Sequence, residues 1–387
     1  CFDKYIFIHE IPRRFNYDYL YDCKYIVHRW HDTCASLDNE GLGQPFGNSS
    51  TWFATNQHSL EVIFHNRIKR YRCLTTNPLK AAAFYAPYYP GLDFSRYMLD
   101  SYNTSVRDAD HLDFLKFLRA KPEWNHMGGK DHFMVTGRPA WDFHRLRDDN
   151  FLWGNNLMLR PESRNMTIVT TESGLLETNL FAIPRPTFFH PSNDKQVYNW
   201  MKKVRAQKRS TLFAFVGAPR LNLNTSIRSE LMEQCNASKN ACEMLDCSQD
   251  LCFTPQNVMN IFLRSVFCLQ PSGDSPTRRS TFDSIVGGCI PVFFSRTYEQ
   301  YLWHLPQDIF SYSVIIPDND IKEKLVNIES ILREVPNERV LRMREVVIST
   351  IPRIIYRHPK GKFDSIEDAF DVTIRKVIER IESLKQE

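Results

Sequence analysis

The sequence contains no apolar run close to the roughly eighteen residues that a membrane-spanning helix requires. It also contains no secretory signal, and it opens at Cys1 within a segment that has the apolar pattern of a strand. A spanning helix within the chain is therefore excluded. We expect the chain to be the ectodomain of a longer protein whose membrane anchor lies outside these residues.

Familiar nucleotide and metal motifs are missing as well. There is no Walker loop and no Gly-x-Gly-x-x-Gly turn, which disfavours ATP and NAD as ligands. There is no Asp-x-Asp pair in a loop suited to a cation, so we expect no bound metal and no cofactor. The net charge of +4 is far below that of a dense basic surface, so we expect no nucleic-acid partner.

The composition that remains is that of a soluble globular protein, with 42% hydrophobic and 24% charged residues. A chain of 387 residues is longer than a single core usually serves, so we expect two domains. Aromatic residues make up 13% of the chain, which suits either deep cores or surfaces on which sugars stack.

Glycosylation signals and cysteines indicate a secretory compartment. Five Asn-x-Ser/Thr acceptors are present, at Asn48, Asn103, Asn165, Asn224 and Asn236. Four of the ten cysteines cluster in a short polar stretch, at Cys235, Cys242, Cys247 and Cys252. Their spacing includes no Cys-x-x-Cys pair and no histidine lies nearby, so we expect disulfides here and not a zinc site. Spacing does not tell which cysteines pair.

Strand-like and helix-like segments alternate along the chain, which predicts an α/β fold with largely parallel sheets. In the first half, the expected strands are 4–12, 81–89, 131–137 and 166–172, and the expected helices are 57–71 and 108–118. In the second half, the expected strands are 211–217, 267–271, 290–294 and 312–317, and the expected helices are 258–266, 280–286, 321–334, 339–349 and 365–384.

A run of prolines and a basic stretch at 202–209 mark the expected domain boundary. We expect two Rossmann-like domains that face a cleft. Their predicted limits are 1–195 for the N-terminal domain and 196–358 for the C-terminal domain. We expect residues 359–387 to contain a C-terminal helix that packs back across the domains.

The turn at residues 270–280 (QPSGDSPTRRS) is the segment most suited to chemistry. It joins an expected strand to an expected helix, and the N–H groups at a helix start attract anions. Its donor-binding candidates are Ser272, Gly273, Thr277, Arg278, Arg279 and Ser280. Since an arginine can fork onto a phosphate, the turn predicts a diphosphate site.

Asp283 lies one helical turn after Arg279, and two interpretations of it remain open. It can form an ion pair with Arg279 along the helix surface. Alternatively, its carboxylate can hold the ribose hydroxyls of a nucleotide bound at the same turn.

The residues around this turn carry a family resemblance. The run at 268–294 (CLQPSGDSPTRRSTFDSIVGGCIPVFF) resembles the donor-binding signature of the exostosin-like family 47 glycosyltransferases, in the form of the plant xyloglucan galactosyltransferases. Four further stretches are similar in the same order along the chain: YIFIHEIPRRFN (5–16), TWFATNQHSLEVIFHNRIKRYRCL (51–74), GGKDHFMVTGRPAWDF (128–143) and FVGAPR (215–220). The similarity spans nearly the whole chain.

The resemblance implies a fold of the GT-B type, with the donor held by the C-terminal domain and the acceptor by the N-terminal domain. It implies inverting transfer without a metal, from UDP-galactose to a xylosyl side chain of xyloglucan. It further implies a type II protein of the Golgi lumen, with a homodimer or a complex of Golgi glycosyltransferases as partners.

An inverting transferase needs a general base and groups that stabilise the departing nucleotide. The candidates for the base lie in the N-terminal half and are His9, Glu10, Asp131, His132 and Asp142. The sequence does not rank them. The candidates for contact with the acceptor are Trp52, Tyr88 and Trp141, each of which can also be a core residue.

Two alternatives stay open. A related enzyme can use UDP-galacturonate or a UDP-pentose, because donor choice rests on a few residues of the pocket. Arg138 and Arg296 are available cations for a galacturonate carboxylate. A protein of another class, a non-catalytic polysaccharide-binding scaffold, would be free to lose the arginines that this chain retains.

Overall fold

The computed structural model describes residues 1–26, 32–98, 102–174, 177–220, 226–248 and 251–386. The chain divides into two compact units. The first contains Cys1–Gln44, Thr55–Arg185 and Ala369–Glu387, and the second contains Pro45–Ala54 and Pro186–Asp368. The predicted limits at 195 and 358 thus differ by about ten residues from the places where the chain changes unit, and residues 45–54 belong to the second unit. No helix among the described residues has the length and apolar character needed to cross a membrane.

The first unit contains a parallel sheet of short, buried strands. These are β1 (Ile6–Ile8), β2 (Ala83–Tyr85), β3 (His132–Val135), β4 (Thr167–Thr170) and β5 (Leu180–Ala182). They are hydrogen-bonded in chain order, and every neighbouring pair is parallel. The carboxyl ends of all five strands therefore lie at one edge of the sheet.

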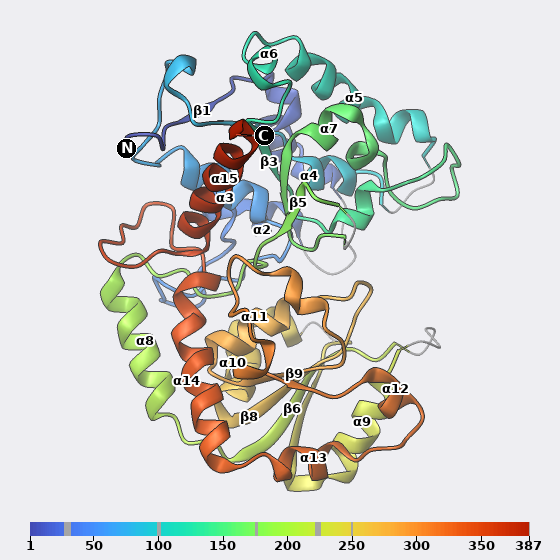
Figure 1. Cartoon of the computed structure of the whole chain (residues 1–387). Coiled ribbons are helices and arrows are strands. Elements are labelled where there is room, and N and C mark those ends of the chain that lie inside the picture. Colours follow the sequence, from blue (N-terminus) through green and yellow to red (C-terminus); the bar gives the residue numbers. More distant parts are fainter. Residues whose placement is uncertain (27–31, 99–101, 175–176, 221–225, 249–250, 387) are drawn as a thin grey trace. The chain divides into compact units, whose positions relative to one another are not determined.

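Helices of the first unit cover this sheet (Figure 1). They are α1 (Tyr17–Tyr21), α2 (Thr33–Gly41), α3 (Leu60–Ile68), α4 (Pro90–Ser95), α5 (Thr104–Arg119), α6 (Trp124–Met127), α7 (Pro161–Asn165) and α15 (Ala369–Gln386). The C-terminal helix α15 joins this unit because Phe370 packs on Phe64, with 4.7 Å between the ring centroids. The guanidinium of Arg67 lies 4.5 Å above the ring of Phe370.

The second unit contains another parallel sheet, whose strand order reverses once. Its strands are β6 (Thr211–Gly217), β7 (Cys242–Asp246), β8 (Ser265–Gln270), β9 (Ile290–Phe293) and β10 (Val314–Ile315). The order is β10-β9-β8-β6-β7, so the chain changes direction across the sheet between β6 and β8. Such a switch point is where open α/β sheets bind ligands. Both sheets confirm the predicted α/β class with two Rossmann-like domains.

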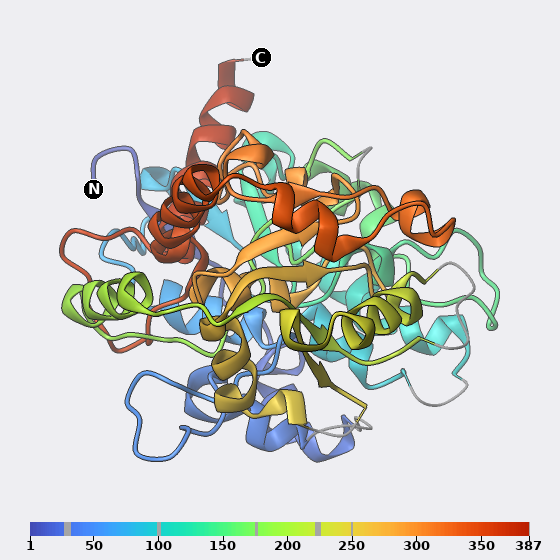
Figure 2. The ribbon, with the colours of Figure 1, turned by 90° about the horizontal axis from the view of Figure 1, so that it is seen from below.

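Helices lie on both sides of the second sheet. They are α8 (Asp194–Ala206), α9 (Arg228–Ala237), α10 (Pro255–Arg264), α11 (Arg279–Val286), α12 (Asp318–Lys322), α13 (Ile328–Glu334) and α14 (Asn337–Ile354). In Figure 1, α8 and α14 lie on one side of the strands and α9 and α12 on the other. Figure 2 shows the same strands from below, with α8 at the left.

The single helix predicted at 321–334 is wrong, because two short helices occupy this stretch. Lys324 has a φ of 54°, a left-handed conformation that ends a helix. The side chain of Asn327 then accepts a hydrogen bond from the N–H of Ser330 and starts α13.

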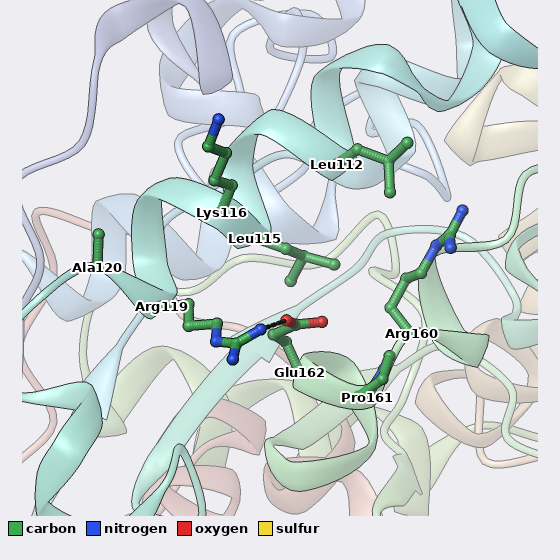
Figure 3. A pocket seen from close by; sticks show the side chains of 8 residues that line it. All are labelled: Leu112, Leu115, Lys116, Arg119, Ala120, Arg160, Pro161 and Glu162. Atoms are coloured by element: carbon green, nitrogen blue, oxygen red, sulfur yellow. Dashed lines mark hydrogen bonds and ion pairs between the residues drawn. The ribbon is translucent and has the colours of Figure 1, made fainter.

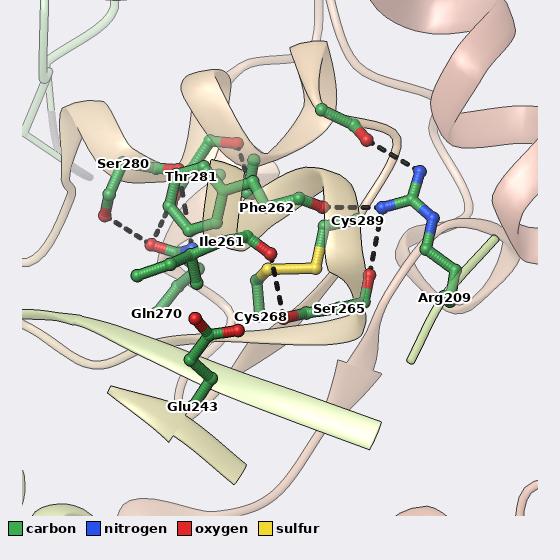
Figure 4. Close-up of a disulfide and its surroundings, with 12 residues drawn as sticks. Arg209, Glu243, Ile261, Phe262, Ser265, Cys268, Gln270, Ser280, Thr281 and Cys289 are labelled. Carbon is green, nitrogen blue, oxygen red and sulfur yellow. Dashed lines mark hydrogen bonds between the residues drawn. A yellow bond between two sulfur atoms is a disulfide. The ribbon is translucent and has the colours of Figure 1, made fainter. Parts of the chain in front are cut away.

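All ten cysteines form disulfides: Cys1–Cys73, Cys23–Cys34, Cys235–Cys242, Cys247–Cys252 and Cys268–Cys289. The predicted disulfides of the polar cluster are confirmed. Cys268 lies in β8 and Cys289 directly before β9, so this buried bond links two neighbouring strands of the second sheet (Figure 4). Beside it, the guanidinium of Arg209 donates to the carbonyl oxygens of Phe262, Ser265 and Gly287.

Candidate functional site

The loop between β8 and α11 lies at the switch point of the second sheet. Within this loop, the N–H of Gly273 donates to the carbonyl of Ser275 over 2.9 Å, which closes a tight turn. Ser272 is exposed and Thr277 is buried. Ser280 donates from Oγ to Gln270 Oε1 over 2.6 Å, so its hydroxyl ties the start of α11 to the end of β8.

Arg278 extends from the loop across the end of β6. Its Nη2 donates to the carbonyl of Val216 over 2.7 Å, and its backbone N–H donates to the hydroxyl of Tyr298 over 2.9 Å. Its Nη1 is buried and has no hydrogen-bond partner among the described residues. Burial lowers the pKa of this guanidinium to about 10. A buried donor without an acceptor is costly, so an anion at this position would be stabilising.

Gly217 makes room for the side chain of Arg278. A Cβ at this position would lie 2.8 Å from Nη2 of Arg278 and equally close to the ring of Phe215. The last residue of β6 therefore has to be glycine if the arginine is to lie across the strand end.

Arg228, in the first turn of α9, is a functional candidate that the sequence did not reveal. Its Nε donates to the carbonyl of Ser272 over 3.0 Å, and its Nη1 donates to the carbonyl of Ala218 over 2.9 Å. Burial, together with the charges of Arg278 and Arg220, lowers its pKa to about 9. The loop approaches so closely that a Cβ on Gly273 would lie 2.9 Å from Nη2 of Arg228.

These arginines form a cationic cluster at the carboxyl ends of β6 and β8. We call Arg220, Arg228 and Arg278 the arginine cluster. Asp274 pairs with Arg220 over 2.9 Å, but the side chain of Asp274 is 71% exposed. Solvent therefore weakens the attraction, and Asp274 compensates little of the positive charge of the cluster. An excess of positive charge at a switch point fits a ligand with more than one negative charge, such as a diphosphate.

Arg279 and Asp283 form a separate ion pair inside the second unit. Nε of Arg279 donates to Oδ2 of Asp283 over 3.0 Å, and the guanidinium lies 3.5 Å above the ring of Phe188. The N–H of Phe188 donates to the other carboxylate oxygen over 3.4 Å. Burial raises the pKa of Asp283, although the positive charge of Arg279 acts to lower this pKa. The ion pair with Arg279 is thus present, but it is buried and does not lie on the helix surface.

The five base candidates fall into two places in the first unit. Asp131 and His132 lie at the amino end of β3, where the Asp131 carboxylate accepts from Nδ1 of His132 over 2.8 Å and from Nδ1 of His126 over 2.9 Å. The ring of His9 stacks on His132, with 5.0 Å between the centroids. Burial lowers the pKa of His9 to about 3, so this imidazole is neutral at physiological pH.

Glu10 comes directly after His9 at the carboxyl end of β1, and Asp142 lies in the short helix Ala140–Phe143 that comes after β3 in the chain. Asp142 is fully buried, and both of its oxygens accept hydrogen bonds from protein donors. Glu10 is exposed, and with His9, Lys121 and Glu123 it lines a pocket of about 630 Å³. Glu10 is the one candidate base whose side chain is open to solvent.

The three acceptor candidates differ in exposure. Tyr88 is fully buried, with its ring stacked on Phe114 and its hydroxyl donating to Asp93, so neither face is open to a sugar. Trp52 belongs to the second unit and packs against the rings of Phe189 and Trp200. Trp141 is exposed and stacks beside Trp153, which is exposed as well.

Four of the five glycosylation candidates are exposed: Asn48, Asn103, Asn165 and Asn236. Asn224 lies outside the described residues. A second pocket, of about 560 Å³, lies between α5 and α7, with Arg119 and Glu162 paired at its wall (Figure 3). None of the predicted site residues lines it. In the described part of the chain, no group of three or more His, Cys, Asp or Glu side chains is arranged to hold a metal ion.

Glu61 is a further residue that sequence reasoning missed, and it organises the carboxyl edge of the first sheet. Its carboxylate is fully buried and accepts the N–H groups of Gly91, Leu92 and Gly137, over 2.8–3.1 Å. These bonds join the starts of α3 and α4 to the loop after β3. Burial raises the pKa of Glu61 to about 7, although the three N–H groups act in the opposite direction.

This raised pKa predicts a pH-dependent stability. Between the ordinary pKa of about 4.5 and the folded-state value of about 7, the native state keeps a proton that the unfolded state loses. Stability should therefore fall as the pH rises through this window, by about 3 kcal/mol if each pKa unit is worth about 1.4 kcal/mol. In Glu61→Gln the fall should be smaller by that amount, and in the exposed control Glu338→Gln it should persist. Urea unfolding at pH 4.5 to 7.5 measures the difference, and identical slopes in wild type and Glu61→Gln would refute the assignment.

The Exostosin GT47 domain model matches residues 1–334. Over the whole chain, the sequence is 44% identical to a probable xyloglucan galactosyltransferase, GT12, and to the xyloglucan galactosyltransferase MUR3, both from Arabidopsis thaliana. The chain covers 78% and 64% of these two proteins, respectively. It is 38% identical to xyloglucan-specific galacturonosyltransferase 1 of the same plant, over 98% of this chain and 58% of that protein.

Proposed function

The chain belongs to the exostosin family 47 of glycosyltransferases, and we propose that it transfers galactose from UDP-galactose to xylosyl side chains of xyloglucan. The galactosyl unit would be attached in β linkage, with inversion at the anomeric carbon. The proposal is supported by 44% identity to two xyloglucan galactosyltransferases over the full chain.

The arginine cluster is the observation that carries the donor assignment. Transfer of the sugar leaves negative charge on UDP, and this charge has to be stabilised as the bond to the sugar breaks. Buried guanidinium groups of Arg228 and Arg278, together with the N–H groups at the start of α11, supply that stabilisation without a metal ion. We therefore propose that the enzyme needs neither a metal nor another cofactor.

For the general base we propose Glu10. A base has to reach the acceptor hydroxyl, directly or through one water. Glu10 lies after the carboxyl end of β1, the edge of a parallel sheet at which ligands bind, and its side chain is open to solvent. The other four candidates are buried.

The second candidate function is transfer of galacturonate, favoured by the 38% identity to a galacturonosyltransferase. A galacturonate donor needs an additional cation near its carboxylate. The two arginines that the sequence offered for this role are already paired: Arg138 with Asp142 over 2.6 Å, and Arg296 with Glu299. This pairing supports the uncharged sugar.

We propose a location in the Golgi lumen, with the chain as the ectodomain of a type II protein. Five disulfides and four exposed Asn-x-Ser/Thr acceptors support a secretory compartment. Association with itself or with other Golgi glycosyltransferases remains part of the same proposal.

A donor screen tests the proposed reaction. Purified protein and a xylosylated glucan oligosaccharide are incubated with UDP-galactose, UDP-galacturonate, UDP-arabinose or UDP-glucose, each with and without a chelator. We expect a hexose-sized gain in acceptor mass with UDP-galactose, unaffected by the chelator. If the protein prefers UDP-galacturonate to UDP-galactose, the second candidate function, transfer of galacturonate, is correct. If no donor reacts and calorimetry shows no binding of UDP, the protein is a non-catalytic scaffold.

A further inference from the structure

Two tryptophans of the first unit lie side by side at its surface. Trp141 is 40% exposed and Trp153 is 44% exposed. Their ring centroids are 5.7 Å apart and their planes differ by 28°, which is an offset stacked arrangement. No other tryptophan in the described part of the chain is exposed to this degree. Two large apolar rings in water are unfavourable, so their exposure calls for a ligand.

The polar edge of this pair is fixed by a buried carboxylate. Nε1 of Trp153 donates to Oδ1 of Asp142 over 2.7 Å, and Nε of Arg138 donates to Oδ2 over 2.6 Å. The ring of Phe94 meets the ring of Trp153 edge-on, with 5.5 Å between the centroids. The guanidinium of Arg138 lies 4.8 Å above the ring of Phe94. Trp153 is thus held by Asp142 at its N–H and by the ring of Phe94.

The backbone holds the two rings in register with each other. Trp141 lies in the short helix Ala140–Phe143, which a four-residue loop joins to β3. The N–H of Asn155 donates to the carbonyl of Asp142 over 3.0 Å. Gly154 has a φ of +85°, and a Cβ there would lie 2.5 Å from the same carbonyl oxygen. The segment that carries Trp153 can approach Trp141 this closely because residue 154 is glycine.

We propose that Trp141 and Trp153 form a platform on which sugar rings of the acceptor polysaccharide stack, and that Asp142 positions this platform. The inference rests on the proposed function, which supplies a polysaccharide acceptor. An uncharged sugar ring offers flat C–H faces to an aromatic ring. The platform suits such a ligand because the charge of the carboxylate that holds Trp153 is compensated by Arg138. The platform follows β3, at the same edge of the sheet as Glu10.

The assignment gives Asp142 a role other than that of the base. Both of its oxygens accept from fixed donors, and its side chain is fully buried, so a sugar hydroxyl has no access to it. Asp142 is a positioning residue that acts through Trp153.

Single substitutions of the two tryptophans test the platform. In Trp141→Ala and Trp153→Ala we expect KM for a xylosylated oligosaccharide to rise about tenfold, as lost aromatic stacking implies. The affinity for UDP, measured by calorimetry, should stay unchanged. The matched control is Phe310→Ala, which removes an aromatic ring of 48% exposure from the second unit and should alter neither value.

The variant Asp142→Asn separates positioning from base catalysis. The amide of asparagine has only one acceptor oxygen, and its NH₂ group is a donor. One of the two N–H groups, of Trp153 or of Arg138, therefore faces another donor and loses its hydrogen bond. We expect KM to rise as in the tryptophan variants, while the pH profile of kcat keeps its shape. A collapse of kcat with loss of the acidic limb would show instead that Asp142 is the base, and would overturn its positioning role.

Direct titration of acceptor keeps this test distinct from that of the proposed function. If wild-type protein transfers no sugar, calorimetric binding of the oligosaccharide to wild type and to Trp153→Ala still decides the platform. If wild type and both tryptophan variants have equal affinity or equal KM for the oligosaccharide, the platform is overturned. The variant Trp153→Phe, which keeps a ring but loses the N–H to Asp142, should fall between wild type and Trp153→Ala.

Discussion

Replacing Arg278 by alanine should lower kcat/KM for UDP-galactose on the order of a hundredfold and weaken UDP binding strongly. The reason is that Arg278 provides a buried donor, Nη1, with no partner among the described residues, at the switch point of the second sheet. Removal of one preorganised donor to a developing anion costs roughly this factor. Calorimetry with UDP and steady-state kinetics measure the two effects separately.

The control for this variant is Arg296→Ala. Arg296 is an exposed arginine that pairs with Glu299 in the neighbouring short helix, so its loss should change neither UDP affinity nor turnover. Because Arg278 also binds the carbonyl of Val216, thermal unfolding of Arg278→Ala and of the charge-retaining Arg278→Lys should be compared with wild type. A folded Arg278→Ala protein that binds UDP with wild-type affinity would contradict the donor site.

Replacing Glu10 by glutamine should lower kcat by roughly a hundredfold or more, since a positioned base contributes about 10²–10⁴ to the rate. Binding of UDP should be unchanged, because the donor site lies in the other unit. The exposed carboxylate after β1 is the feature on which this expectation depends. Steady-state kinetics and calorimetry with UDP measure the two effects separately.

Glu123→Gln is the matched control for Glu10→Gln. Glu123 lines the same pocket but comes from the segment that follows α5, and not from the carboxyl end of a strand. It should retain most of the wild-type kcat. Equal losses in the two variants would indicate a general effect on the pocket, and full activity of Glu10→Gln would exclude Glu10 as the base.

Strands with continuous apolar runs could be predicted from the sequence, including the edge strands β1 and β10, whereas the charged edge strand β7 could not. The run TLFAFVG at 211–217 forms β6 with the predicted limits. β7 (Cys242–Asp246) was not predicted, because it is a half-exposed edge strand that contains Glu243 and Asp246 and lies within the cysteine cluster. Charged residues at an edge remove the apolar pattern from which a strand is recognised.

The turn that carries the donor candidates could be located from sequence, but the partners of its side chains could not. Arg228 lies more than forty residues before the turn, and only the neighbouring positions of β6 and β8 in the sheet bring it to the carbonyl of Ser272. The contact between Asp283 and the N–H of Phe188 spans 95 positions. Local spacing carries no information about such long-range contacts.

The most direct test of the proposed function is the product formed from UDP-galactose and a xylosylated glucan oligosaccharide. The added sugar is identified by mass, and its anomeric configuration by NMR of the purified product. We expect a single added galactose in β linkage to xylose, formed by wild type and strongly reduced in Arg278→Ala. An α-linked product, or another sugar transferred in its place, would contradict it.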